Sequence, residues 1–152
     1  MKKLSLLISI LLVLFLFSSC NKNKPYIIVT DDSFSPFCYK ESTGEAAGFD
    51  IEIIKAIAKD QNLNIEIRAI GLLESLDAVE NDQADAAIAA IIPTDEFYEK
   101  FDFSNMYYKE EYAVAVKKGC NAELLEKINN GLTNIIENGK YEEILKEYVY
   151  IQ

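Results

Sequence analysis

Residues 25–60, which read PYIIVTDDSFSPFCYKESTGEAAGFDIEIIKAIAKD, decide the fold of this 152-residue chain. They open with a short apolar run rich in β-branched residues, Tyr26–Val29, which predicts a buried strand. They close with GFDIEIIKAIAKD (48–60), where apolar residues at 51, 54, 57 and 58 are separated by charged ones and predict an amphipathic helix. Acidic, hydroxyl and aromatic side chains lie between the two. This arrangement is typical of the ligand sites of α/β domains, where such groups follow the carboxyl end of a strand.

The rest of the chain continues the alternation of strands and helices. Further strands are predicted at 63–67, 86–90 and 112–116. Further helices are predicted at 72–81, from Thr94 onward, and twice within 121–149, with a break at Asn138-Gly139. Three β-α units in this order imply a parallel sheet with right-handed crossovers. The predicted fold class is therefore α/β, with a mostly parallel sheet flanked by helices.

The same stretches carry a resemblance to a known family. The segments TDDSFSPF (30–37) and GFDIEIIKAIAK (48–59) resemble the N-terminal lobe of the family 3 extracellular solute-binding proteins, the amino-acid receptors of ABC importers. FDFSNMYY (101–108) and the region from KGCNAELLEKIN (118–129) to the end extend the similarity over nearly all of residues 25–150. The resemblance implies one lobe of the type 2 periplasmic binding protein fold.

The chain departs from this family in length. Family members normally leave the first lobe after the segment that FDFSNMYY matches, build a second lobe and then return. Here Tyr107-Tyr108 is followed within a few residues by VAVKKG (114–119), which matches the return strand. The resemblance therefore implies a single lobe over 25–152, with the second lobe absent and the junction near 109–113.

The resemblance also assigns a candidate ligand site. In amino-acid-binding members the aspartate after the first strand contacts the ligand ammonium and an aromatic residue packs on the ligand. Asp31 and Phe34 keep these two features. Other family positions are altered in this sequence. The candidate ligand-binding residues are Asp31, Phe34, Leu72, Ala89, Ala90, Ile92 and Phe97.

The altered positions weaken the expected site. Phe97 stands where the family has the arginine that grips the ligand carboxylate, Ala90 and Ile92 replace a glycine and a threonine or serine, and Leu72 replaces an aromatic residue. A charge-assisted hydrogen bond contributes about 1.5–3 kcal/mol, so its loss weakens carboxylate binding by roughly ten- to a hundredfold. Three of the candidate residues also have a purely structural interpretation. Asp31 would cap a turn, Phe34 would belong to the core, and Phe97 would pack inward over a remnant cleft.

The N-terminus predicts export. Residues 1–19 combine two lysines with an apolar run and read as a secretory signal peptide. Ser18-Ser19-Cys20 resembles a lipobox, which implies a lipid anchor on Cys20 and a polar tether over 20–24. Ordinary cleavage that leaves a free Cys20 is the alternative. The predicted location is the periplasm or the cell surface, as a membrane-anchored lipoprotein.

Composition excludes several classes of function. The net charge is −10, and loss of Lys2 and Lys3 with the signal peptide takes it to −12, which disfavours nucleic acid and anionic lipid as partners. Histidine is absent, and the cysteines have no zinc spacing, so no metal or other cofactor is expected. Cys38 and Cys120 could form a disulfide or remain free thiols. No nucleophile-base pair is evident, and we expect no enzyme activity.

Two functions from different classes follow. The first is a solute-binding lipoprotein that takes an amino acid or similar small solute and works with an ABC permease, with a possible homodimer supplying the second wall of the site. The alternative is a non-transport interaction or sensor lipoprotein that uses the former cleft face to bind a protein partner. A degenerate gene product without activity is a third possibility.

Overall fold

A computed structural model describes residues 24–149. The predicted signal peptide, Cys20 and most of the predicted tether therefore lie outside the described residues. A five-stranded sheet runs through the centre in the order β5-β1-β6-β8-β7, and a small three-stranded sheet has the order β2-β3-β4. The strands are β1 (Tyr26–Thr30), β2 (Ser33–Phe34), β3 (Cys38–Lys40), β4 (Ala46–Ala47), β5 (Ile65–Ala69), β6 (Ala86–Ala87), β7 (Phe101–Phe103) and β8 (Ala115–Lys117). The helices are α2 (Phe49–Asp60), α3 (Leu72–Glu80), α4 (Asp95–Lys100), α5 (Ala122–Glu137) and α6 (Lys140–Tyr148).

The central sheet has a parallel half and an antiparallel half. β1 pairs in parallel with β5 on one side and with β6 on the other, as the predicted β-α units require. β8 pairs antiparallel with β6 and with β7, so the returning segment after the predicted junction joins the same sheet. These pairings confirm the predicted α/β class.

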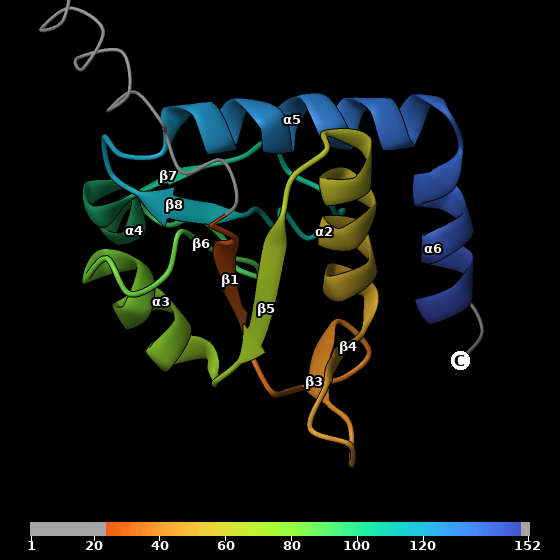
Figure 1. Cartoon of the computed structure of the whole chain (residues 1–152), viewed down its shortest axis with the longest axis horizontal. Helices are drawn as coiled ribbons and strands as arrows, with labels where there is room; N and C mark the ends of the chain where they lie inside the picture. The colour runs from red at the N-terminus through yellow and green to blue at the C-terminus, as the bar shows by residue number, and fades with distance from the viewer. Residues whose placement is uncertain (1–23, 150–152) are drawn as a thin grey trace, which may run out of the picture.

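Helices cover both faces of the sheet. Figure 1 shows α2, α5 and α6 on one face and α3 and α4 on the other, which makes a three-layer domain. The larger core cluster lies under α2 and α5, where α2 supplies Phe49, Ile53, Ile54 and Ile57 and α5 supplies Leu124, Ile128, Leu132 and Ile135. None of the helices within 24–149 has the length and apolarity that a bilayer span requires.

The start of α2 is fixed by a small hairpin that the sequence did not reveal. The N–H groups of Phe49 and Asp50 donate to the carbonyl oxygens of Pro36 and Phe37, at 2.9 Å each. Gly48 has a φ of 121°, and a Cβ there would lie 2.3 Å from the Phe37 oxygen, so only glycine fits. The backbone of the β2–β3 turn therefore occupies the first donors of α2.

A tight turn joins the segments after β7 and before β8. The N–H of Tyr107 donates to the carbonyl of Tyr112 at 2.8 Å, and the N–H of Glu111 donates to the carbonyl of Tyr108 at 3.0 Å. Glu111 has a φ of 65°, in the left-handed region that tight turns use. This turn lies where the sequence predicts the junction near 109–113, and the absence of a second lobe stays a prediction.

Candidate ligand site at the carboxyl edge of the sheet

The three parallel strands end at one edge of the sheet. β1 ends at Thr30, β5 at Ala69 and β6 at Ala87, and their register places these ends side by side. The segments that follow these strands carry every predicted site residue except Phe97. Asp31 and Phe34 follow β1, Leu72 begins α3 after β5, and 88–92 follow β6. Ligands of open α/β sheets bind beyond such carboxyl ends. We call this region the carboxyl edge.

Asp31 forms a local turn at this edge. Its Oδ1 accepts hydrogen bonds from the N–H of Asp32 at 2.6 Å and from the N–H and hydroxyl of Ser33 at 3.2 Å each. The capping alternative is therefore realised for one oxygen of the carboxylate. The other oxygen, Oδ2, accepts no hydrogen bond from the described residues, so it is open to a cationic donor.

Exposed apolar side chains follow the strands that end at the carboxyl edge. Phe34 is 43% exposed, Leu72 39% and Ile92 48%, so these three predicted residues face solvent. Ile70 and Leu73, at 39% and 71%, add to this surface and were not predicted as site residues. The sequence feature that could have indicated them is the apolar run Ile70-Gly71-Leu72-Leu73 at the start of a helix. Only one face of a helix packs inward, so some of these apolar side chains must face solvent.

Phe97 and Ala89 point to the interior instead. Phe97 lies in α4, whose N-cap Thr94 accepts the Phe97 N–H at 3.3 Å as the sequence predicts. Its half-buried ring meets Phe101 edge to face at 6.2 Å between centroids and packs on the core cluster that includes α3. Ala89 is buried in that same cluster. The inward alternative for Phe97 is the one that the structure adopts.

A buried carboxyl group supports the loop after β6 from below. Asp50, in the first turn of α2, is fully buried, and its Oδ2 accepts the N–H of Ala90 at 2.7 Å. Ala90 has a φ of 48°, a left-handed conformation that costs a non-glycine residue about 1–2 kcal/mol. The hydrogen bond that the Ala90 N–H donates to Asp50 holds Ala90 in this conformation. Asp50 was not predicted as part of the site, although it lies three and four residues before the buried Ile53 and Ile54, on the same helix face.

Asp50, Cys38 and Tyr107 lie close together in the interior, and the pKa of each is raised there. Burial raises the pKa of the Asp50 carboxyl to about 7, while the Ala90 N–H opposes this shift. Burial, with the nearby Asp50 charge, raises the pKa of the Cys38 thiol to about 12 and raises the pKa of the Tyr107 hydroxyl well above its usual value. Asp50 Oδ1 and the Tyr107 hydroxyl form no well-aligned hydrogen bond among the described residues, yet they lie close enough to shift each other's pKa. At pH values well below 7 the Asp50 carboxyl is therefore neutral.

Other chemistry has no support at this edge. Within residues 24–149 no group of three or more cysteine, aspartate or glutamate side chains lies close enough to hold a metal ion. Cys38 is buried and Cys120 is exposed, and both are free thiols, which answers the question of the disulfide that the sequence left open. At this edge, Oδ2 of Asp31 accepts no hydrogen bond from the described residues and lies on a segment that also carries the exposed Phe34.

The three-layer α/β arrangement of this chain is the fold of type 2 periplasmic binding protein domains, to which solved structures of that class are similar. Comparison with known proteins shows to which family the chain belongs. The family model for bacterial extracellular solute-binding proteins, family 3, matches residues 26–150. The chain therefore belongs to this family, whose members are solute-binding proteins and not enzymes.

A curated relative is similar to the chain in sequence, and two solved structures are similar to it in fold. The chain is 28% identical to the arginine-binding extracellular protein ArtP of Bacillus subtilis over 97% of its own length and 62% of ArtP. Substrate-binding domain 2 of GlnP from Lactococcus lactis superposes with a TM-score of 0.79 and 22% identity, covering 84% of this chain and 96% of that one. Domain 1 of TmArgBP, in an arginine-bound form, gives a TM-score of 0.66 and 24% identity, covering 72% of this chain and 91% of that one.

The chain spans less than two thirds of the length of the first curated relatives that it matches. It spans 62% of the length of ArtP and less than half of the length of two further relatives. It corresponds to about one lobe of such a protein. Its relatives are amino-acid-binding extracellular or periplasmic proteins of ABC importers, which agrees with the predicted export.

Proposed function

We propose that this protein is an extracytoplasmic amino-acid-binding lipoprotein of the ABC importer class, with a reduced ligand site at the carboxyl edge. The observation that carries the proposal is the open Oδ2 of Asp31 at the end of β1, in a chain of this family. A ligand ammonium would bind there, and the exposed face of Phe34 would pack on the ligand. An ABC permease is the corresponding partner.

The altered residues define how this site differs from a complete one. Phe97 is packed inward and offers no cation to a carboxylate. Ile92 presents apolar surface where the family has a threonine or serine, and Leu72 presents an aliphatic side chain where the family has an aromatic one. Small-molecule sites usually bury about 70–90% of their ligand, which one open edge does not achieve. We therefore expect dissociation constants in the range of about 10 µM to 10 mM, favouring ligands whose binding depends on a cation more than on a carboxylate.

A single lobe is a reasonable binding unit. TmArgBP domain 1, one of the structures that this fold resembles, has been solved in an arginine-bound form as a separate domain. That finding concerns TmArgBP, and it supports the proposal that one lobe of this family holds a ligand without the second. Arginine is therefore the first amino acid to test.

Titration calorimetry of the mature protein against arginine, lysine, histidine and glutamine tests this proposal. Asp31→Asn removes the negative charge while the amide oxygen still caps the Asp32 turn, so it separates binding from folding. We expect Asp31→Asn to weaken binding at least about tenfold, and the exposed control Glu137→Gln to leave it unchanged. No heat from any of these amino acids at about 10 mM, the weak end of the expected range, would refute the proposal.

A second candidate function has its own observation. Five large apolar side chains at or near this edge, Phe34, Ile70, Leu72, Leu73 and Ile92, are at least 39% exposed. Exposed apolar clusters mark surfaces that bind other proteins. A sensor or interaction lipoprotein would use the same surface to dock a protein partner. Crosslinking in membranes from a photoreactive residue at position 73, with position 137 as the control, would recover that partner.

The lipid anchor at Cys20 remains part of the proposal. A Cys20→Ser variant should appear in the soluble fraction after cell lysis, whereas the unchanged chain sediments with membranes. Recovery of both forms in the same fraction would remove the anchor from the proposal and leave the binding function untouched.

A further inference from the structure

The outer edge of β5 carries backbone groups without partners. β5 is the terminal strand of the central sheet and pairs only with β1. The N–H of Tyr26 donates to the carbonyl of Asn64, and the N–H of Ile70 donates to the carbonyl of Thr30, so the even-numbered residues of this strand face β1. The N–H and C=O groups of Ile65, Ile67 and Ala69 must then point outward. They make no hydrogen bond to any residue within 24–149.

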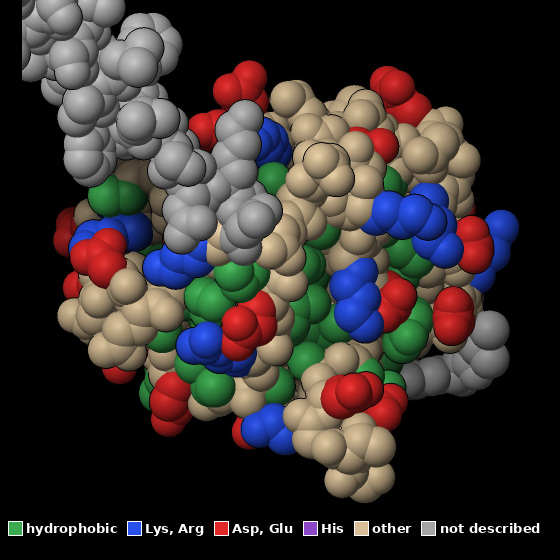
Figure 2. Space-filling model, viewed as in Figure 1, with side chains coloured by type: hydrophobic (Ala, Val, Ile, Leu, Met, Phe, Trp, Pro, Cys, Tyr) green, Lys and Arg blue, Asp and Glu red, His purple; other side chains and the backbone are tan. Residues whose placement is uncertain are grey.

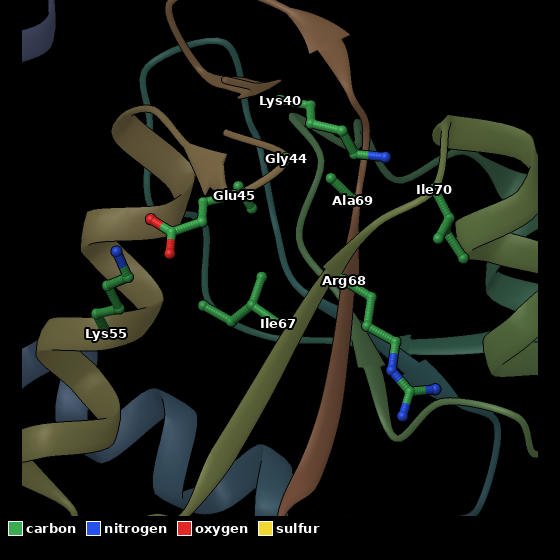
Figure 3. A pocket seen from close by; sticks show the side chains of 9 residues that line it. Lys40, Gly44, Glu45, Lys55, Ile67, Arg68, Ala69 and Ile70 are labelled. Carbon is green, nitrogen blue, oxygen red and sulfur yellow. The ribbon is translucent and has the colours of Figure 1, made fainter. Parts of the chain in front are cut away.

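An open groove runs along this edge. It has a volume of about 660 Å³ and lies between β5, the β3–β4 hairpin and α2, and Ile67 and Ala69 form part of its floor. Figure 3 shows Lys40 reaching over the Ala69 end, Lys55 and Glu45 at the α2 side, and Arg68 extending to the opposite side of β5. Figure 2 shows hydrophobic side chains along the middle of this face, with blue and red groups on either side. The edge is therefore open, apolar in its middle and flanked by both charges.

The sequence of β5 is complementary to itself. The strand reads Ile-Glu-Ile-Arg-Ala, and Glu66 and Arg68 are half exposed on the same face, with an ion pair of 2.8 Å between them. When two copies run antiparallel about a two-fold axis at Ile67, Ile65 lies opposite Ala69 and Glu66 lies opposite Arg68 of the second copy. The outward backbone groups then form the hydrogen-bonded pairs. Glu66 and Arg68 fall on the non-hydrogen-bonded pairs, where opposite side chains lie closest.

Neighbouring registers are less favourable. A two-fold axis at Glu66 or at Arg68 would place like charges directly opposite each other, on non-hydrogen-bonded pairs where opposite side chains lie closest. Charged residues on edge strands usually prevent pairing between copies. In β5, Glu66 and Arg68 have opposite charges, so in the register centred on Ile67 they attract the second copy and do not repel it.

We propose that a second copy of this chain docks on the β5 edge, and that the two central sheets join through an antiparallel β5–β5 pair centred on Ile67. The contact is small, with the five residues of β5 from each copy, so the dimer is weak and is favoured where copies are concentrated. Because the two strands run in opposite directions, the two carboxyl edges point away from each other. This dimer therefore adds no second wall to the ligand site. The proposal of this dimer does not depend on the proposed function.

Reciprocal charge reversal in the full-length protein tests the pairing. Glu66→Lys alone places a lysine opposite Arg68 of the second copy, and Arg68→Glu alone places a glutamate opposite Glu66, twice in each dimer. We expect each variant to self-associate about tenfold more weakly than the unchanged chain in analytical ultracentrifugation of detergent-solubilised protein. When the two variants are mixed, every cross-strand pair is again between opposite charges, and the mixed dimer should form as well as the original.

The matched control uses another exposed ion pair. Glu123 and Lys127 pair at 2.7 Å on α5, remote in sequence from β5, and their reversals Glu123→Lys and Lys127→Glu change the net charge by the same amounts. These variants should self-associate as the unchanged chain does, and mixing them should add nothing. A chain that is monomeric at several hundred micromolar, or a dimer that responds to the α5 and β5 reversals equally, would overturn the proposal. Ile67→Cys in a Cys120→Ser background should crosslink to itself on oxidation, because position 67 lies on the axis.

Discussion

The carboxyl edge and the interior directly beneath it differ sharply. At the surface, Phe34, Leu72 and Ile92 stand in solvent, and one oxygen of Asp31 is open. Beneath it, Phe49 is fully buried and meets the rings of Phe37, Tyr107, Tyr108 and Tyr141 at 5.5–6.2 Å between centroids. The difference teaches that a tightly packed aromatic interior can support an edge whose own side chains stay largely open to solvent.

The largest contrast in stability should lie between two phenylalanines. Phe49→Ala should lower the free energy of unfolding by about 3–5 kcal/mol, because it empties the centre of the aromatic cluster. Phe34→Ala should lower it by less than about 1 kcal/mol, because that ring is half exposed. Urea denaturation monitored by far-UV circular dichroism measures both. Equal losses would show that the surface and the interior are not energetically distinct.

The buried carboxyl of Asp50 should make stability fall as pH rises. Its pKa is about 7 in the folded chain against 3.8 in the unfolded chain, so folding favours the protonated form. The contribution is full below about pH 4 and disappears between about pH 4 and 7, by up to about 4 kcal/mol at about 1.4 kcal/mol per pKa unit. Asp50→Asn keeps an acceptor for the Ala90 N–H and cannot titrate. The difference in unfolding free energy between the two proteins should therefore change across this range and stay constant above it, and a constant difference from about pH 4 to 8 would contradict the prediction.

Substitution by glycine should change the free energy of unfolding in opposite directions at Ala90 and at Ala89. Ala90→Gly should raise the free energy of unfolding by up to about 1 kcal/mol, because it relieves a φ of 48°. Ala89→Gly should lower it by about 1 kcal/mol, because that residue is buried and has no positive φ. Thermal unfolding of the two variants gives the comparison. Destabilisation by both would mean that Asp50 does not hold Ala90 in a strained conformation.

The smallest effect on stability should come from the most exposed member of the edge. Leu73→Ser should change the free energy of unfolding by no more than about 0.5 kcal/mol, since its side chain is 71% exposed. It should still weaken any protein contact made by the edge, because an apolar side chain leaves that surface. A stability loss above about 1 kcal/mol would assign Leu73 to the interior.

Local sequence patterns were sufficient for the elements with clear boundaries. The apolar run of β1, the 3.6-residue period of α2, the Thr94 cap and the break between α5 and α6 were all predicted, and the structure confirms them. β5 begins two residues later than predicted because the N–H of Leu63 bonds to the carbonyl of Ala58 at 2.8 Å and closes the end of α2. β6 is shorter than predicted because the left-handed Ala90, bonded to Asp50, turns a run of alanines that contains no turn signal.

The candidate site was harder to predict because its geometry depends on distant residues. Motifs placed Asp31, Leu72 and Ile92 on segments that follow neighbouring strand ends, and the structure brings these strand ends together. Asp31 caps the turn with Oδ1 and leaves Oδ2 open because the N–H and hydroxyl of Ser33 both donate to Oδ1. Phe97 packs inward against the ring of Phe101. Whether these residues bind a ligand stays a prediction.

The hydrogen-bonded turn between Tyr107 and Tyr112 has a practical consequence. Its ends are joined at 2.8 Å, its exposed middle is Lys109–Glu111, and both flanking tyrosines are anchored in the core. A chain opened between residues 109 and 110 could therefore accept a whole guest protein whose own termini lie close together, without displacing a strand.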